Sequence, residues 1–198
     1  MTKNFLHATG AVYDGGMSIA LLVVAAAVVI PHVRIALSFA PAPGLPPDVA
    51  RAAAAEAAGL WAPHGVEIVV VDPGRLLPAD TVVLRVAVGT APAPPGSSIA
   101  LGEIGFDIDG MPGHLVTVFV DRVLRLLAEA RVSGVPMAAW PTSFQRRVLA
   151  RAIGRVIAHE VGHFVLRMRG HSRAGLMRVS HTAGDLADPG RLPFQLRN

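Results

Sequence analysis

Apolar residues occur along the chain in short blocks separated by Gly- and Pro-rich stretches, and these blocks predict about five strands. The blocks are rich in Val and Ile and are bounded by turn-forming residues, which is typical of strands. They cover residues 32–40, 66–72, 80–89, 97–110 and 114–123. The fourth block is the weakest. Its Asp109-Gly110 pair predicts a turn rather than a Ca²⁺ site shared with Asp107.

Two longer segments follow a helical pattern. Residues 48–65 are rich in alanine, with Asp48 as the expected N-cap and an end at a following glycine. Residues 140–166 repeat apolar positions every three or four residues, and Thr142 and Gln145 have capping-box spacing. The order of one strand, one helix, four strands and a second helix predicts an α+β domain with a mixed sheet.

An uncharged and strongly apolar run, residues 15–31, precedes the first predicted strand. It has 17 residues. A membrane-spanning helix needs about 20, with about 17 as the lower limit, whereas the core of a signal peptide needs about 7–15. The apolar run is therefore compatible with an export signal, a short membrane anchor or a buried element. Its length favours the first two. We expect residues 1–31 to be a signal peptide or anchor, and residues 32–198 to form an extracytoplasmic domain, secreted or membrane-anchored.

Composition narrows the chemistry that is available. Cysteine is absent, so there is no disulfide framework and any metal ion must be held by His, Asp or Glu. The formal net charge is +4, and eight arginines lie between Arg146 and Arg178, where Glu160 is the only acid. This stretch suits an anionic partner such as a membrane surface, or it is a solvated helix face. Because no nucleic-acid motif accompanies the arginines, no nucleic-acid partner is expected.

The second predicted helix carries the motif His-Glu-x-x-His. Because a helix turns by about 100° per residue, His159, Glu160 and His163 share its apolar face. The opposite face is expected to carry Arg147, Arg151 and Arg155. Two imidazoles one turn apart can bind one Zn²⁺, and the adjacent glutamate can accept a proton from water. The pattern indicates metal-dependent hydrolysis.

A catalytic zinc site needs a third protein ligand and one open position. No glutamate follows Glu160 in the chain, which excludes a downstream Glu ligand. The candidates are His171, His181, Asp185 and Asp188. His171 is the nearest of them and directly follows Gly170, where a glycine turn would bring the chain back towards the helix.

The stretch HEVGHFVLRMRGHSRAGLM resembles the metzincin clan of zinc metallopeptidases, in which a third His follows HExxH and a Met lies in a tight turn. The likeness covers roughly residues 33–185 when the order of strands and helices is included. It implies a compact metzincin-like zincin domain with a mixed, mostly parallel sheet, a backing helix and an active-site helix. It also implies that the edge strand, residues 99–105, pairs with extended substrate.

The resemblance also implies a role for each residue of the motif. Zn²⁺ would be held by His159, His163 and His171. Glu160 would polarise the attacking water, and Met177 would lie in a turn beneath the metal. The family's glycine and third histidine correspond to Leu166 and Arg169 here, so the bend would move to Gly170 and the ligand to the next residue.

These patterns predict a zinc metallopeptidase, with a metalloendopeptidase as the best match, that acts on peptide or protein substrates and associates with a membrane through residues 17–31. Two alternatives stay open. One is a catalytically inactive zinc-binding protein, and the other is a basic, membrane-associated interaction protein in which HExxH occurs by coincidence. Metal analysis would separate the last of these from the other two.

Overall fold

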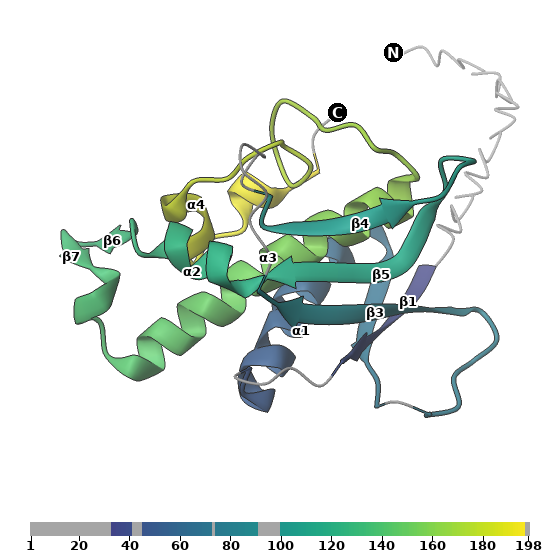
Figure 1. Ribbon diagram of the computed structural model, residues 1–198, viewed down its shortest axis with the longest axis horizontal. Helices are drawn as coiled ribbons and strands as arrows, with labels where there is room; N and C mark the ends of the chain where they lie inside the picture. Colours follow the sequence, from purple (N-terminus) through teal and green to yellow (C-terminus); the bar gives the residue numbers. More distant parts are fainter. Residues whose placement is uncertain (1–32, 41–44, 73, 91–99, 197–198) are drawn as a thin grey trace, which may run out of the picture.

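The computed structural model describes residues 33–40, 45–72, 74–90 and 100–196 of the chain (Figure 1). The apolar run, and with it the expected signal peptide or anchor, lies outside the described residues. Within the described ranges, no helix is both long enough and apolar enough to cross a membrane.

Five strands form one sheet in the order β2-β1-β3-β5-β4. They are β1 (Val33–Phe39), β2 (Val66–Val70), β3 (Thr81–Gly89), β4 (Gly102–Phe106) and β5 (Pro112–Phe119). β1, β2, β3 and β5 are parallel to one another, and β4 runs antiparallel to β5 at the edge of the sheet. The prediction of an α+β domain with a mixed, mostly parallel sheet is confirmed.

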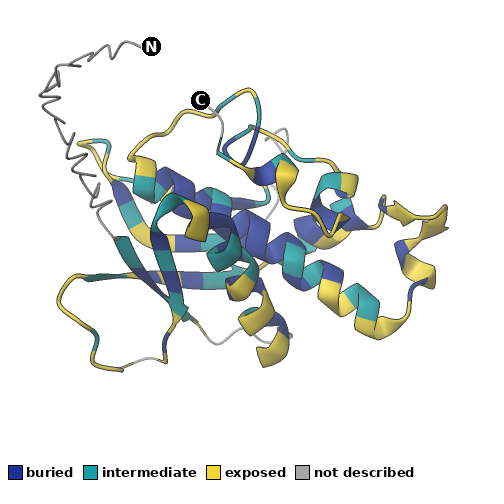
Figure 2. Cartoon of the chain, turned by 180° about the vertical axis from the view of Figure 1, so that it is seen from behind, coloured by how far each residue is buried: buried dark blue, intermediate teal, exposed yellow. Residues whose placement is uncertain are grey.

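Helices α1 (Pro47–Trp61) and α3 (Thr142–Leu166) pack against the sheet and against each other (Figures 1 and 2). Alternate residues of the central strands point towards the helices and are fully buried. They are Ile35, Leu37, Leu84, Val86, Val116 and Val118. The two helices approach closely, because a Cβ at Gly154 of α3 would lie only 2.7 Å from Glu56 Cβ of α1. This packing fixes α3, which carries the HExxH motif, against the sheet.

The fifth strand is shorter than the sequence predicted, because residues 120–123 belong to helix α2 (Val120–Leu127). Val123 and Leu127 are four residues apart and both are fully buried, so the helical period prevails over the strand period at this point. The other elements are short. They are β6 (Arg131–Val132), β7 (Val135–Pro136), α4 (Ala183–Ala187) and 3-10 helices at Ala62–His64, Met137–Ala139 and Leu192–Phe194.

Both long helices begin differently from the prediction. Asp48 lies in the first turn of α1, whose N-cap is Pro46. Thr142 is the first residue of α3, and Gln145 donates a hydrogen bond to the Trp140 carbonyl (2.8 Å) instead of closing a capping box. In each helix an extended proline occupies the N-cap position, and proline has no side-chain oxygen that could accept a capping hydrogen bond.

Arg155 does not lie on a solvent-exposed face, contrary to the helical-wheel prediction. Its side chain is fully buried, because α1 and the C-terminal segment enclose α3 on that side. It donates hydrogen bonds to Glu56 Oε1 (3.1 Å), to the Asp185 carbonyl and to the Gly190 carbonyl (2.6 Å). Of the other two arginines expected on this face, one is exposed and one is half-buried. Arg155 therefore forms an internal joint, whereas the other two arginines of this face are at least partly accessible to solvent.

Candidate metal centre

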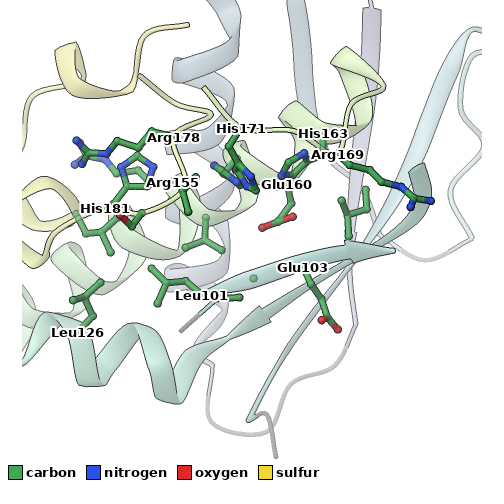
Figure 3. A pocket seen from close by; sticks show the side chains of 18 of the residues that line it. Leu101, Glu103, Leu126, Arg155, Glu160, His163, Arg169, His171, Arg178 and His181 are labelled. Atoms are coloured by element: carbon green, nitrogen blue, oxygen red, sulfur yellow. The ribbon is translucent and has the colours of Figure 1, made fainter. Parts of the chain in front are cut away.

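Three histidines from two segments of the chain meet beside the C-terminal half of α3 (Figure 3). His159 and His163 lie one turn apart on α3, and His171 lies in the loop that follows. One ring nitrogen from each residue lies within 4.8 Å of the nitrogens of the other two. The ring centroids are 4.9, 4.9 and 5.2 Å apart. These three residues, which were expected to bind metal, therefore form a group that could hold one ion.

The chain turns back towards His171 earlier than the sequence suggested. Arg167 is the C-cap of α3 and adopts a left-handed conformation with φ 50°, and Met168 N donates to the His163 carbonyl (3.3 Å). Gly170 is not among the described glycines with positive φ, so the expected glycine bend at this position is wrong. The reversal at Arg167 occurs even though a left-handed conformation costs a non-glycine residue about 1–2 kcal/mol.

Backbone carbonyls determine which nitrogen of each helical histidine is free. His159 Nδ1 lies 2.8 Å from the Leu176 carbonyl oxygen, and His163 Nδ1 lies 2.7 Å from that of Met168. A carbonyl oxygen can only accept, so each Nδ1 carries the proton and each Nε2 keeps its lone pair. Such orientation by a second partner is characteristic of histidines that ligate metals. The sequence could not predict which two carbonyls bind these rings, since every residue has a carbonyl group.

Burial keeps the two helical imidazoles uncharged. It lowers the pKa of His159 to about 4, outweighing the Leu176 carbonyl, which acts in the opposite direction. Burial also lowers the pKa of His163. Both rings are therefore neutral near pH 7, which is the form that binds a metal ion. Three neutral nitrogen ligands form one of the sets used by catalytic zinc sites.

Glu160 is buried beside the histidines, and its carboxylate points into the space between α3 and β4 (Figure 3). Burial, with a further contribution from the nearby Glu103 carboxylate, raises the pKa of Glu160 to about 8. A carboxyl group with a strongly raised pKa in a cleft is a candidate for proton transfer.

Gly102 lets β4 pass directly over this carboxylate. A Cβ at Gly102 would lie 2.6 Å from Val156 Cγ1 and 3.2 Å from Glu160 Oε1. Gly102 was not among the predicted site residues, although an isolated glycine inside a strand is a signal for close backbone approach. The missing side chain therefore sets the width of the site at this point.

The histidines and Glu160 form one side of a cleft of about 590 Å³, and β4 forms the other (Figure 3). Phe119 N of β5 donates to the Leu101 carbonyl (2.9 Å). In the alternating antiparallel pattern that follows, the backbone groups of Gly102 and Ile104 face away from β5. Because β4 is an edge strand, these groups have no neighbouring strand among the described residues. An extended peptide can pair with an edge of this kind.

Met177 is buried beneath α3 in a turn that Ser172 N closes by donating to the Met177 carbonyl (2.8 Å). Its side chain contacts the helix at Gly162, where a Cβ would lie 3.0 Å from Met177 Cε. The preceding residue, Leu176, supplies the carbonyl that orients His159. The turn therefore supports the helix and orients one of the three histidines.

The other candidates for a third ligand lie outside the three-histidine group. His181 lines the cleft, but its ring centroid is 6.2 Å from that of His159, and its ring stacks on Phe194. Both ring nitrogens of His181 are buried and have no hydrogen-bond partner within the described part of the chain. Asp185 caps α4, and Asp188 accepts a hydrogen bond from a backbone amide (2.5 Å).

Comparison of the chain with models of known protein families and with curated protein sequences found no match. An assignment of function therefore depends on the chemistry of the site itself.

Proposed function

We propose that the protein is a zinc-dependent peptidase. The observation that carries this proposal is the convergence of three histidine nitrogens beside a buried glutamate. His159, His163 and His171 would hold the ion. Bound Zn²⁺ would polarise a substrate carbonyl and lower the pKa of a water molecule towards about 7. The edge strand beside the helix and the buried Met177 turn support this class, because the metzincin resemblance implies both.

Glu160 would act as the general base. Its carboxylate would accept a proton from the attacking water and return it to the leaving amine. A cation held by the neighbouring histidines favours the ionised carboxylate, whereas burial favours the protonated form and raises its pKa. The two effects oppose each other, which suits a group that must both take up and release a proton near neutral pH.

The substrate that suits the cleft is an extended segment of a peptide or protein. Its backbone would pair with the outward-facing groups of Gly102 and Ile104. Leu101 and Leu186 are among the apolar side chains that line the cleft, and Arg155, which also lines it, is already ion-paired. We therefore expect the enzyme to prefer uncharged, apolar side chains beside the cleaved bond.

We further propose that the domain acts outside the cytoplasm, at a membrane or after secretion. Residues 15–31 support this proposal, because an uncharged apolar run of 17 residues suits an export signal or a short anchor. The mass of the mature protein would distinguish the two. Loss of the run would indicate a cleaved signal, and its retention an anchor.

Replacement of Glu160 tests the catalytic proposal, with Glu103→Gln as the matched control. Glu103 is an exposed acid on the cleft side of the structure, on β4. We expect Glu160→Gln to retain stoichiometric zinc and to cleave a peptide library about 10²–10⁴-fold more slowly than the wild type. Glu103→Gln should retain zinc and should reduce cleavage far less than Glu160→Gln does, because it removes only the smaller of the two contributions to the raised pKa of Glu160.

Unchanged cleavage by Glu160→Gln would rule out the general-base role. Stoichiometric zinc binding without cleavage by the wild type would favour the alternative of a catalytically inactive zinc-binding protein. Absence of zinc binding in the wild type would contradict both, and the basic interaction protein would then be the better description.

A further inference from the structure

The N-terminal ends of the parallel strands lie together at one end of the molecule. β1, β2, β3 and β5 run in the same direction, so their first residues lie side by side at one end of the sheet. The turn between β4 and β5 lies at this end of the sheet too, because β4 is antiparallel to β5. The C-terminal end of α3 lies at the same end of the molecule (Figures 1 and 2).

Among the described residues, the β4–β5 turn and the end of α3 expose four apolar side chains at this end. Ile108, at the β4–β5 turn, is 100% exposed, and Met111 is 41% exposed. Leu166 and Met168, at the end of α3, are 40% and 37% exposed. We call these four residues the strand-entry face. An exposed isoleucine at the tip of a turn has no role in packing within the described residues, and clustered exposed apolar side chains mark contact surfaces.

Arg169 connects the two halves of the strand-entry face. Its Nη2 donates to the Asp107 carbonyl (3.0 Å), and its guanidinium lies 5.0 Å from the centroid of the Phe106 ring. The β4–β5 turn and the loop after α3 are thus joined by direct contacts, and their apolar side chains belong to one surface.

Charge does not dominate this surface. Arg167 and Arg169 are exposed beside it, and so are Asp107 and Asp109. Asp107 Oδ1 also accepts a hydrogen bond from Met111 N (2.7 Å) within the turn. Because both signs are present in similar number, apolar contact rather than charge attraction would determine what binds here.

The position of the N-terminal run identifies the partner. Residue 31 ends the run and β1 begins at Val33, so only His32 lies between them. Three Cα steps from Ile30 to Val33 span at most about 11 Å. The partner that binds the apolar run must therefore lie close to the end of the sheet where β1 begins. Ile108 and Met111 lie at the same end.

We propose that the strand-entry face rests on a lipid bilayer, with Ile108 and its neighbours in contact with the acyl-chain boundary. The inference relies on the proposed membrane association of residues 15–31 but not on peptidase activity. The β6–β7 hairpin lies at the opposite end of the molecule (Figures 1 and 2), so in this orientation it would point away from the bilayer.

The absence of cysteine allows a direct test by single labels. Ile108→Cys and the control Val132→Cys, in the β6–β7 hairpin and 40% exposed, would each carry a polarity-sensitive dye. The full-length chain would be reconstituted in phosphatidylcholine vesicles that contain brominated acyl chains. We expect the dye at position 108 to shift to shorter wavelength and to lose most of its emission to bromine, and the dye at position 132 to do neither. A third variant, Met168→Cys, should behave like Ile108→Cys.

Equal responses at positions 108 and 132, whether both quenched or both unaffected, would overturn the orientation. A chain that stays free of the vesicles would also overturn it, because its premise would be missing. Neither readout depends on hydrolysis. Loss of the peptidase proposal would therefore leave this result standing, and the reverse also holds.

Discussion

Gly102 lies where β4 crosses α3 beside Glu160, and its lack of a side chain is needed for that approach. An added Cβ would lie 2.6 Å from Val156 Cγ1 and 3.2 Å from Glu160 Oε1, so the strand or these two side chains must move. Gly105, on the same strand, provides a matched control because a Cβ there meets nothing within 4 Å. The two positions separate loss of strand flexibility from steric pressure on the site.

We expect Gly102→Ala to reduce peptide cleavage while zinc stays bound, and to lower the free energy of unfolding by about 1–3 kcal/mol, as overpacking typically does. Gly105→Ala should leave both quantities nearly unchanged. Denaturant unfolding and cleavage rates for the two variants provide the measurement. Similar losses in both would show that the strand, rather than the contact with Glu160, is responsible.

His171 and His181 test the assignment of the third ligand. His171 is exposed and its ring nitrogen belongs to the three-histidine group, whereas His181 lies outside that group and stacks on Phe194. We expect His171→Ala to weaken zinc binding by more than the roughly 10–100-fold typical of changes to outer partners. His181→Ala should change the affinity less. Calorimetric titration of zinc into the metal-free proteins would measure both, and the opposite order would move the ligand role to His181.

The helical part of the site could be predicted from the sequence, because His159 and His163 lie one turn apart and helical periodicity is local. The route to His171 could not. The chain reverses at Arg167 rather than at the glycine that favours such a turn, because hydrogen bonds and packing of the loop outweigh intrinsic preference there. The carbonyl partners of the His159 and His163 rings could not be predicted either, since they depend on the path of the loop and not on residue type.

At the level of elements, α4 contains the capping box that α3 lacks. The Thr182 hydroxyl and backbone amide both donate to Asp185 Oδ2 (2.7 Å each), and Asp185 N donates back to Thr182 Oγ1 (3.1 Å). Arg178 donates to the same carboxylate. Partial burial acts to raise the pKa of Asp185, but the hydrogen bonds from Thr182 and Arg178 together outweigh it and lower the pKa.

This cap predicts a stability difference that depends on pH. Asp185→Asn should lower the free energy of unfolding by about 1 kcal/mol at pH 7, as loss of an N-terminal cap interaction does. Because the folded-state pKa is depressed, the contribution is present above the ordinary value of 3.8 and is lost as the pH falls below it. Urea unfolding at pH 7 and pH 3 would measure it. If the difference in free energy of unfolding between the wild type and Asp185→Asn is the same at both pH values, the ionised carboxylate does not have this role.

The strands were predictable within a few residues because alternation and flanking Gly and Pro are local signals. Their order in the sheet depends on contacts between distant segments, which local patterns do not encode. The predicted end of β5 was wrong because a Val-rich stretch fits either period until its packing partners are known. Spacing alone predicts a capping box at Thr142. That spacing is present, but the proline before it takes the capping position, which only the backbone conformation reveals.

At the scale of the whole molecule, one buried cation connects three distant segments. Arg155 of α3 bonds to Glu56 of α1, 99 residues away, and to two carbonyls of the C-terminal segment. Arg191 also donates to Glu56, at 2.8 Å. Arg155 further stacks over Phe194, with 4.3 Å from its guanidinium carbon to the ring centroid. The helical wheel placed Arg155 in solvent because a single helix gives no information on which other segments will cover it.

This joint should matter more for stability than the more exposed ion pairs among the described residues. Glu56→Gln would leave the fully buried Arg155 without its ion-pair partner, and breaking a buried pair in this way costs about 3–5 kcal/mol. Glu67→Gln is the control, because it removes the same charge from a pair with Arg34 that is much more exposed and is screened by water. Denaturant unfolding of the metal-free variants should therefore show a large loss for Glu56→Gln and little change for Glu67→Gln. If both variants unfold at the same denaturant concentration as the wild type, the C-terminal segment, which brings Leu186 and His181 to the cleft, must be held in place by its apolar contacts instead.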